Sequence, residues 1–202
     1  MFADYKPQSG FIDQVNQACY DNCASIWDRF PFPNALPGFI EKYYQTSLGK
    51  RVLDVGSGTG ILAQWLADQG FEVLCLDPSP EMVKRCRAKG LNTLQNSIQS
   101  FQPDRQFGMV FAILSLIHVP KNEFAAQLKK ITETLEPEGL IFLGMIEGAG
   151  EGFSEESQYP RFFAYYTLKE LEEQTHKYFV KLDQYYVKAN NIGYILVVLK
   201  KK

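Results

Sequence analysis

The sequence predicts an α/β fold with three layers, in which helices cover both faces of a doubly wound, mostly parallel sheet of seven strands. Strand-like and helix-like segments alternate from Lys50 onward, a pattern typical of parallel sheets. The strand-like segments are almost continuously apolar, as expected where both faces of a sheet are covered. The last two of them adjoin across Asn190-Asn191, which predicts an antiparallel hairpin at one edge of the sheet.

The core, residues 49–202, follows this alternation in order. Ser79 is expected to cap the second core helix, with Pro80 at its first position and Gly90 past its end. The expected strands are 52–55, 71–76, 93–95, 107–114, 140–146, 179–187 and 193–199. The expected helices are 61–69, 79–89, 123–135 and one that starts at the capping box Thr167-Leu168-Lys169-Glu170.

Residues 1–48 form a separate N-terminal helical segment of the same single domain. We expect a helix over about 11–29 and a second, short helix over 38–45. Pro31, Pro33 and Pro37 break the chain between them.

Composition excludes several classes of function. The chain has 202 residues, enough for one domain, and a net charge of −2 gives no basic field for nucleic acid. No apolar run is long enough for membrane insertion, and the first residues lack the features of a secretion signal, so we expect a cytoplasmic protein. Cys19 and Cys23 have no further ligand nearby, so we expect idle thiols and no metal.

The most informative motif is a turn of three alternating glycines, Gly56, Gly58 and Gly60, between a strand and a helix. In dinucleotide-binding turns the third glycine follows the second by three residues, but here that position holds Ile61. The bulk of Ile61 argues against a pyrophosphate at the start of the helix. The turn therefore disfavours a nicotinamide dehydrogenase and indicates another nucleotide or nucleoside at the carboxyl end of parallel strands.

Two carboxylates flank this turn. Asp54 lies just before it, where a carboxylate would repel a pyrophosphate but suits a ligand with an ammonium group. Asp77 closes the next strand, where its two oxygens can accept hydrogen bonds from both hydroxyls of a ribose.

With these residues the chain resembles the class I S-adenosylmethionine-dependent methyltransferases, in particular small-molecule enzymes of the ubiquinone-biosynthesis and tellurite-resistance types. The resemblance covers about residue 15 to the end and implies a Rossmann-like methyltransferase fold. It also implies in-line transfer of a methyl group from S-adenosylmethionine to a small-molecule acceptor, leaving S-adenosylhomocysteine. The motifs that carry it are Leu53-Asp54-Val55-Gly56-Ser57-Gly58-Thr59-Gly60, Leu76-Asp77-Pro78-Ser79-Pro80-Glu81-Met82, Phe107-Gly108-Met109-Val110-Phe111 through Leu116-Ile117-His118-Val119, and Leu135-Glu136-Pro137-Glu138-Gly139-Leu140.

The resemblance implies a set of cofactor-binding residues. The glycine turn would lie under the methionine part, Asp54 would help to bind its amino group, and Asp77 would hold the ribose. Two departures from the family pattern are Ser97 and Gly108, each at a position where an acidic residue is usual. The implied set is Asp54, Gly56, Ser57, Gly58, Gly60, Asp77, Pro78, Met82, Ser97, Ile98, Ala112 and Leu114.

The candidate catalytic residue is His118, just past the fourth strand at the carboxyl face. It is either a general base or a residue that caps the next helix or holds this loop. Tyr20 and Trp27 are seven residues apart, so they share one helix face, and Phe30 follows them. In the family such a segment often folds as a lid over the cofactor; the alternative is ordinary core packing.

The long segment 147–159 and the aromatic residues after it are expected to form the acceptor pocket, with Arg161 and Tyr165 as candidates. Arg161 either holds an anionic group of the substrate or forms a surface ion pair with Glu155 or Glu156.

Nothing in the sequence predicts the oligomeric state or the acceptor. The residues after the fourth strand, Ala112-Ile113-Leu114-Ser115, lack the Asn-Pro-Pro-Tyr pattern of many amino-methylating enzymes. The alternative function is a non-catalytic S-adenosylmethionine-binding or regulatory protein of the same fold.

Overall fold

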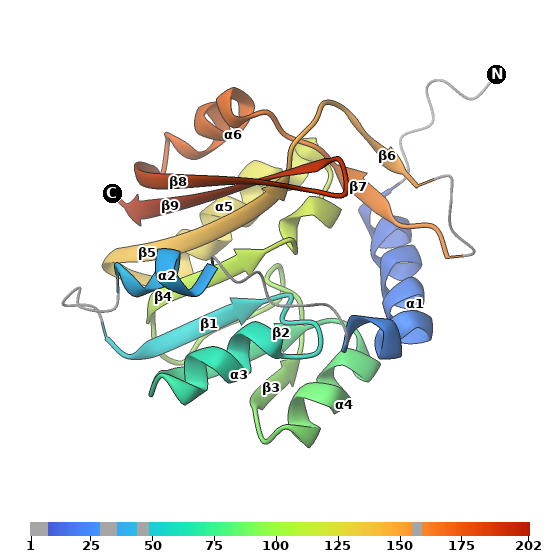
Figure 1. Cartoon of the computed structure of the whole chain (residues 1–202), viewed down its shortest axis with the longest axis horizontal. Coiled ribbons are helices and arrows are strands. Elements are labelled where there is room, and N and C mark those ends of the chain that lie inside the picture. Colours follow the sequence, from blue (N-terminus) through green and yellow to red (C-terminus); the bar gives the residue numbers. More distant parts are fainter. Residues whose placement is uncertain (1–7, 29–35, 44–48, 155–158) are drawn as a thin grey trace.

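The computed structural model describes residues 8–28, 36–43, 49–154 and 159–202, and its centre is a seven-stranded sheet (Figure 1). The expectations for Phe30, the prolines before residue 36, Glu155 and Glu156 lie outside the described residues. In sheet order the strands are β3 (Asn92–Gln95), β2 (Glu72–Asp77), β1 (Arg51–Val55), β4 (Phe107–Ile113), β5 (Leu135–Ile146), β9 (Ile192–Lys201) and β8 (Phe179–Ala189).

The strand directions confirm the predicted fold class. Strands β1 to β5 pair in parallel, whereas β9 pairs antiparallel with both β5 and β8. Asn190 and Asn191 both have positive φ at the tip of the β8–β9 hairpin, as a tight hairpin turn requires. Strand β5 begins at Leu135, earlier than expected, and the preceding helix accordingly ends at Thr134.

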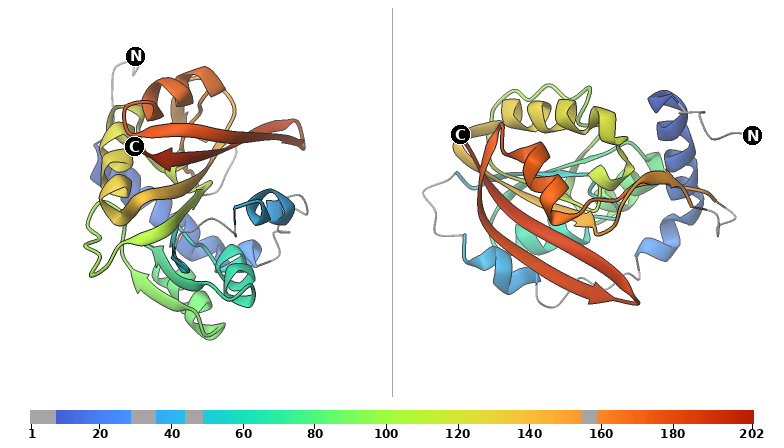
Figure 2. Two further views of the ribbon diagram at one scale, coloured as in Figure 1. Left: turned by 90° about the vertical axis from the view of Figure 1, so that its left-hand side faces the viewer. Right: turned by 90° about the horizontal axis from the view of Figure 1, so that it is seen from above.

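Helices cover both faces of the sheet (Figure 2). Helices α2, α3 and α4 lie on one face and α5 and α6 on the other, while α1 crosses the carboxyl ends of the strands. Over the described residues, no helix combines the length and the apolar character needed to cross a membrane. The helices are α1 (Ser9–Trp27), α2 (Leu36–Glu41), α3 (Ile61–Asp68), α4 (Pro80–Ala88), the 3₁₀ helix η1 (Leu116–His118), α5 (Lys121–Thr134) and α6 (Leu168–Thr175).

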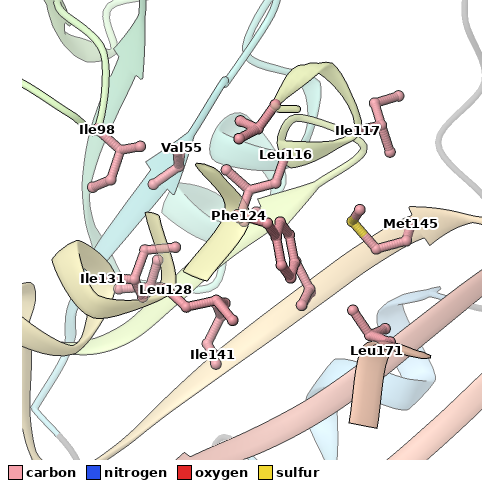
Figure 3. Close-up of a cluster of buried hydrophobic side chains, with 14 of the residues drawn as sticks. Val55, Ile98, Leu116, Ile117, Phe124, Leu128, Ile131, Ile141, Met145 and Leu171 are labelled. Atoms are coloured by element: carbon pink, nitrogen blue, oxygen red, sulfur yellow. The ribbon is translucent and has the colours of Figure 1, made fainter. Parts of the chain in front are cut away.

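The packing of α5 fixes the end of β4. Phe124, Leu128 and Ile131 come from successive turns of α5 and are fully buried against the sheet (Figure 3). Leu116 and Ile117 of η1 join the same cluster. Each such side chain contributes about 1.5–3 kcal/mol by leaving water, so the turn after β4 is held firmly.

The expectation of a plain loop over 147–159 is wrong in one respect. Residues Glu151–Phe153 form strand β6, which pairs antiparallel with β7 (Phe162–Ala164) in a second, two-stranded sheet. Three residues are too few to show the alternation that identifies a strand, and the pairing that stabilises β6 comes from residues nine or more positions later.

Candidate functional site

The glycine turn lies between β1 and α3 at the carboxyl edge of the sheet. Gly56, Gly58 and Gly60 have φ of +68°, +54° and +79°, a region that other residues rarely adopt. A Cβ on Gly56 would lie 2.4 Å from the Cβ of Ser115. The turn therefore needs glycine both for its backbone conformation and, at Gly56, for close packing against the end of β4.

The backbone N–H groups of this turn donate hydrogen bonds to other groups of the protein. Gly56 and Ser57 donate to the carbonyl of Leu76 at 2.8 and 3.0 Å, and Gly58 donates to Asp77 Oδ2 at 2.8 Å. Gly60 N–H donates to the carbonyl of Ser57. These groups do not form a phosphate cradle, in line with the interpretation from the glycine spacing.

Asp54 is a buried carboxylate beneath the turn. Asp54 as a whole is 3% exposed, and its Oδ2 is buried with no hydrogen-bond partner. Its pKa is raised to about 8, mainly because burial disfavours the charged form and further by the negative charges of Cys86 and Asp77. A cationic ligand group near Asp54 would remove this penalty.

Asp77, at the end of β2, fastens the turn to the start of α4. Its Oδ1 accepts from Ser79 N–H at 2.9 Å and its Oδ2 from Gly58 N–H at 2.8 Å. Burial raises the pKa of Asp77 to about 6, although these two hydrogen bonds act against that shift. Since each carboxylate oxygen accepts more than one hydrogen bond, ribose hydroxyls can still bind here.

Helix α1 is tied to this same edge. The hydroxyl of Ser79, which caps α4 by accepting from Met82 N–H as predicted, donates to Asp21 Oδ1 at 2.5 Å. The backbone N–H of Glu81 also points to Asp21, at 3.4 Å.

The other implied cofactor contacts divide by burial. Met82, Ile98 and Ala112 are at most 3% exposed, and the last two belong to the hydrophobic core. Pro78 and Leu114 are exposed, Ser97 is half-buried, and Leu114 has φ of +55°. Of these six residues, three are therefore buried, two are exposed and one is half-buried, so they do not share one exposed surface.

On the acceptor side, Tyr20 and Trp27 of α1 lie together as their spacing predicts, with ring centroids 5.6 Å apart. The Tyr20 hydroxyl lies 2.6 Å from His118 Nε2, and His118 Nδ1 lies 2.7 Å from the carbonyl of Phe162. Because a carbonyl only accepts, Nδ1 carries the proton, and Nε2 accepts from Tyr20.

This environment keeps His118 neutral. Its pKa is lowered to about 4, mainly by burial and also by the positive charge of Arg161, although the hydrogen bond to Phe162 acts in the other direction. The idea that His118 caps the next helix is wrong, because the N-cap residue of α5 is Pro120 and the ring nitrogens of His118 bind Tyr20 and Phe162 instead.

Arg161 and Tyr165 lie beside these rings. The Arg161 guanidinium is 4.9, 5.2 and 5.8 Å from the ring centroids of Phe163, Trp27 and Tyr20. Tyr165 stacks on Phe163 at 6.1 Å. Helix α1, η1 and the residues on either side of β7 thus bring together all five residues that the sequence suggests for the acceptor side: Tyr20, Trp27, His118, Arg161 and Tyr165.

Sequence reasoning missed Asn16, Asp21 and the Phe162-Phe163 pair. Asn16 Oδ1 accepts from Phe162 N–H at 2.8 Å, and His118 binds the carbonyl of the same residue. Asn16 and His118 therefore satisfy both backbone groups of Phe162 in β7. Asn16 lies four residues before Tyr20 on an amphipathic helix. A polar residue on the apolar face was the available signal, whereas Asp21 gave none.

Comparison with known proteins bears on this site. Residues 52–139 match a family model described as a methyltransferase domain. Ubiquinone biosynthesis O-methyltransferase of Xylella fastidiosa is 31% identical over 138 residues, which is 64% of this chain and 54% of that protein. The protein of the same name from Idiomarina loihiensis is 31% identical over 117 residues, 54% of this chain and 47% of that one. The chain spans about half the length of these curated relatives.

Solved structures establish the fold over nearly the whole chain. Burkholderia thailandensis 1,6-didemethyltoxoflavin-N1-methyltransferase, solved with 1,6-didemethyltoxoflavin and S-adenosylhomocysteine, gives a TM-score of 0.82 at 17% identity. The match covers 98% of this chain and 92% of that one. The predicted Rossmann-like architecture is therefore confirmed.

Proposed function

We propose that the chain contains a class I, S-adenosylmethionine-dependent methyltransferase domain and that the protein transfers a methyl group from S-adenosylmethionine to a small-molecule acceptor. The observation that carries the proposal is the pairing of a glycine turn with positive φ angles and Asp54, whose buried Oδ2 has no partner in the described structure. A cofactor that carries an ammonium group satisfies this carboxylate, and a pyrophosphate would not.

The residues at the edge of the sheet fit this cofactor. Asp54 would face its amino group, the glycine turn would lie under its methionine part, and Asp77 would accept from the ribose. S-adenosylmethionine supplies a methyl group on a positively charged sulfur, so the departing thioether needs no further activation. The protein then has to align the acceptor, exclude water and, for a protonated acceptor, remove a proton.

We assign the lid role to the N-terminal segment, residues 1–48, of which α1 is the best-defined part. Its contacts support this role, because Asp21 binds Ser79, Tyr20 binds His118 and Asn16 binds Phe162. Helix α1 thereby bridges the cofactor side and the acceptor side of the edge.

We assign the acceptor atom to a hydroxyl oxygen and the base to His118. The support is the tautomer: Nδ1–H donates to the carbonyl of Phe162, which leaves the Nε2 lone pair as the acceptor. An acceptor hydroxyl that takes the place of the Tyr20 hydroxyl would give its proton to Nε2. The names of the two relatives agree, although the toxoflavin enzyme methylates nitrogen, so the fold alone does not choose the atom.

Titration calorimetry with S-adenosylmethionine, S-adenosylhomocysteine and NAD tests the proposal. We expect both adenosyl ligands to bind and NAD not to bind; NAD binding alone would overturn it. Asp77→Ala should weaken S-adenosylhomocysteine binding by about 2 kcal/mol, because a charged acceptor is lost. The exposed Asp104→Ala is the matched control. The non-catalytic alternative predicts binding without transfer to any hydroxyl, thiol or carboxylate compound.

A further inference from the structure

The setting of Arg161 differs from that of the other arginines that the structure describes. Its guanidinium lies over three aromatic rings, those of Tyr20, Trp27 and Phe163. These rings come from α1 and β7, which are far apart in the sequence but side by side in Figures 1 and 2. The arrangement forms an aromatic box around one positive charge.

Within the described part of the chain, this charge has no acidic partner. Arg51, Arg85 and Arg105 each form an ion pair with a carboxylate, and Arg87 donates to the carbonyl of Thr93. No described carboxylate pairs with Arg161, and its Nε is buried with no hydrogen-bond partner. Arg161 is half-buried, and ring contacts recover only part of the hydration that its guanidinium loses, so an anion would complete this site.

The position of the box places it beside the proposed base. Tyr20 is in contact with both Arg161 and His118, and the His118 and Phe163 ring centroids are 5.0 Å apart. An acceptor whose hydroxyl reached His118 Nε2 would therefore have its other end next to Arg161 and the rings.

We infer that Arg161 and its box select an acceptor that carries an anionic oxygen group, a carboxylate or a phenolate. This rests on the proposed function and names the class of its substrate. The guanidinium fork binds a carboxylate through two parallel hydrogen bonds, and the rings of Tyr20, Trp27 and Phe163 hold the guanidinium in place. Arg161 also adds positive charge to a site that would hold a positively charged sulfur, which further favours an anion.

The experiment compares charged and neutral ligands of the same shape. Protein saturated with S-adenosylhomocysteine is titrated with 4-hydroxybenzoate and 4-hydroxybenzamide, and separately at pH 8.5 with 4-nitrophenol and 4-nitroanisole, by calorimetry and tryptophan fluorescence. We expect at least one anion to bind tenfold or more tightly than its neutral partner. A preference confined to the first pair identifies a carboxylate, and one confined to the second identifies a phenolate.

Variants test whether Arg161 causes the preference. Arg161→Gln should abolish it, Arg161→Lys should retain part of it, and the exposed Arg105→Gln should leave it unchanged. A preference that survives Arg161→Gln, even with a lower Tm, would assign Arg161 to lid stability and overturn the inference. If Arg161→Gln does not fold, the wild-type ligand pairs decide: equal binding within both pairs also overturns it.

Binding of S-adenosylhomocysteine separates this inference from the proposed function. If S-adenosylhomocysteine binds and no anion is preferred, only the substrate class is wrong. If S-adenosylhomocysteine does not bind, the proposed function fails first.

Discussion

The glycine turn after β1 and the cluster of Tyr20, His118 and Arg161 lie on the same edge of the sheet but are assembled in opposite ways. The turn and its carboxylates occupy one short stretch, from Asp54 to Asp77. The cluster depends on contacts between distant segments: Tyr20 and His118 are 98 residues apart, and Asn16 and Phe162 are 146 apart.

This difference predicts different consequences of mutation. The turn is defined by its backbone angles and, at Gly56 and Gly60, by contacts too close for any side chain, so changes there should affect stability and cofactor binding together. The cluster is held by a few hydrogen bonds and ring contacts from one helix. Changes there should affect turnover and acceptor binding and leave cofactor affinity intact.

The largest effect is expected for Gly56→Ala. Its new Cβ would lie 2.4 Å from Ser115 Cβ at a φ of +68°. Left-handed strain costs about 1–2 kcal/mol and overpacking about 1–3 kcal/mol more. Urea unfolding should therefore show a loss of about 3 kcal/mol, accompanied by weaker cofactor binding.

Gly58→Ala is the matched control for that experiment. Gly58 has a φ of +54°, but a Cβ there would have nothing within 4 Å, so only strain of about 1 kcal/mol is expected. The double change Gly56→Ala with Ser115→Gly should recover part of the loss. Equal losses for the two single variants would show that the contact with Ser115 is unimportant.

The second effect concerns the cluster of Tyr20, His118 and Arg161 and leaves the glycine turn unaffected. His118→Ala should lower turnover about 100-fold, because a base in position contributes roughly this much, and should not change the affinity for S-adenosylhomocysteine. Because the pKa of His118 is lowered to about 4, the ring stays in its basic form from pH 8 down to pH 5. Turnover should therefore show no loss near pH 6.5 that is attributable to this residue. Full activity of the variant would show that His118 is not a base and only positions β7.

The same contrast explains what the sequence could predict. The seven strands of the sheet, the cap at Ser79 and the hairpin at Asn190-Asn191 follow from local patterns, and the structure confirms them. Strand β6 was missed because three residues carry no usable period, and its stability comes from pairing with β7.

On the acceptor side, the sequence suggested individual residues but not their partners. Tyr20 and Trp27 were paired by their helical spacing, and Arg161 was singled out by its chemistry. Helix α1 brings Tyr20 to His118 and Asn16 to Phe162. These contacts depend on where the helix docks on a distant strand, and no local sequence pattern encodes that position. The sequence places Asp54 just before the glycine turn, but the lack of a hydrogen-bond partner for its Oδ2 is visible only in the folded chain.

A third, smaller effect returns to the cofactor side. The pKa of Asp54 is about 8 in the folded protein, against an ordinary value of 3.8. A raised carboxyl pKa means that the folded state holds a proton that the unfolded state releases, so the cofactor-free protein should lose stability as pH rises from about 4 to 8. Asp54→Asn should remove this slope and stabilise the cofactor-free protein at pH 7.

The same variant should bind S-adenosylhomocysteine more weakly, because the amino group loses its anionic partner. Thermal unfolding across pH 5–8 and calorimetry measure both effects, with exposed Asp68→Asn as control. A wild-type pH slope that persists in Asp54→Asn would mean that another group causes it.

The smallest effect is expected for Asn16→Ala, and it tests whether the two regions are separable. Asn16 accepts from the N–H of Phe162, while His118 donates to the carbonyl of the same residue. Loss of one hydrogen bond costs about 1 kcal/mol in unfolding free energy. It should also loosen β7 beneath His118, so acceptor KM should rise several-fold while S-adenosylhomocysteine affinity stays constant. Asn22→Ala, an exposed change on the same helix, controls for loss of helix stability. An equal weakening of cofactor and acceptor binding would show that α1 couples the two sides of the site, and that they do not act independently.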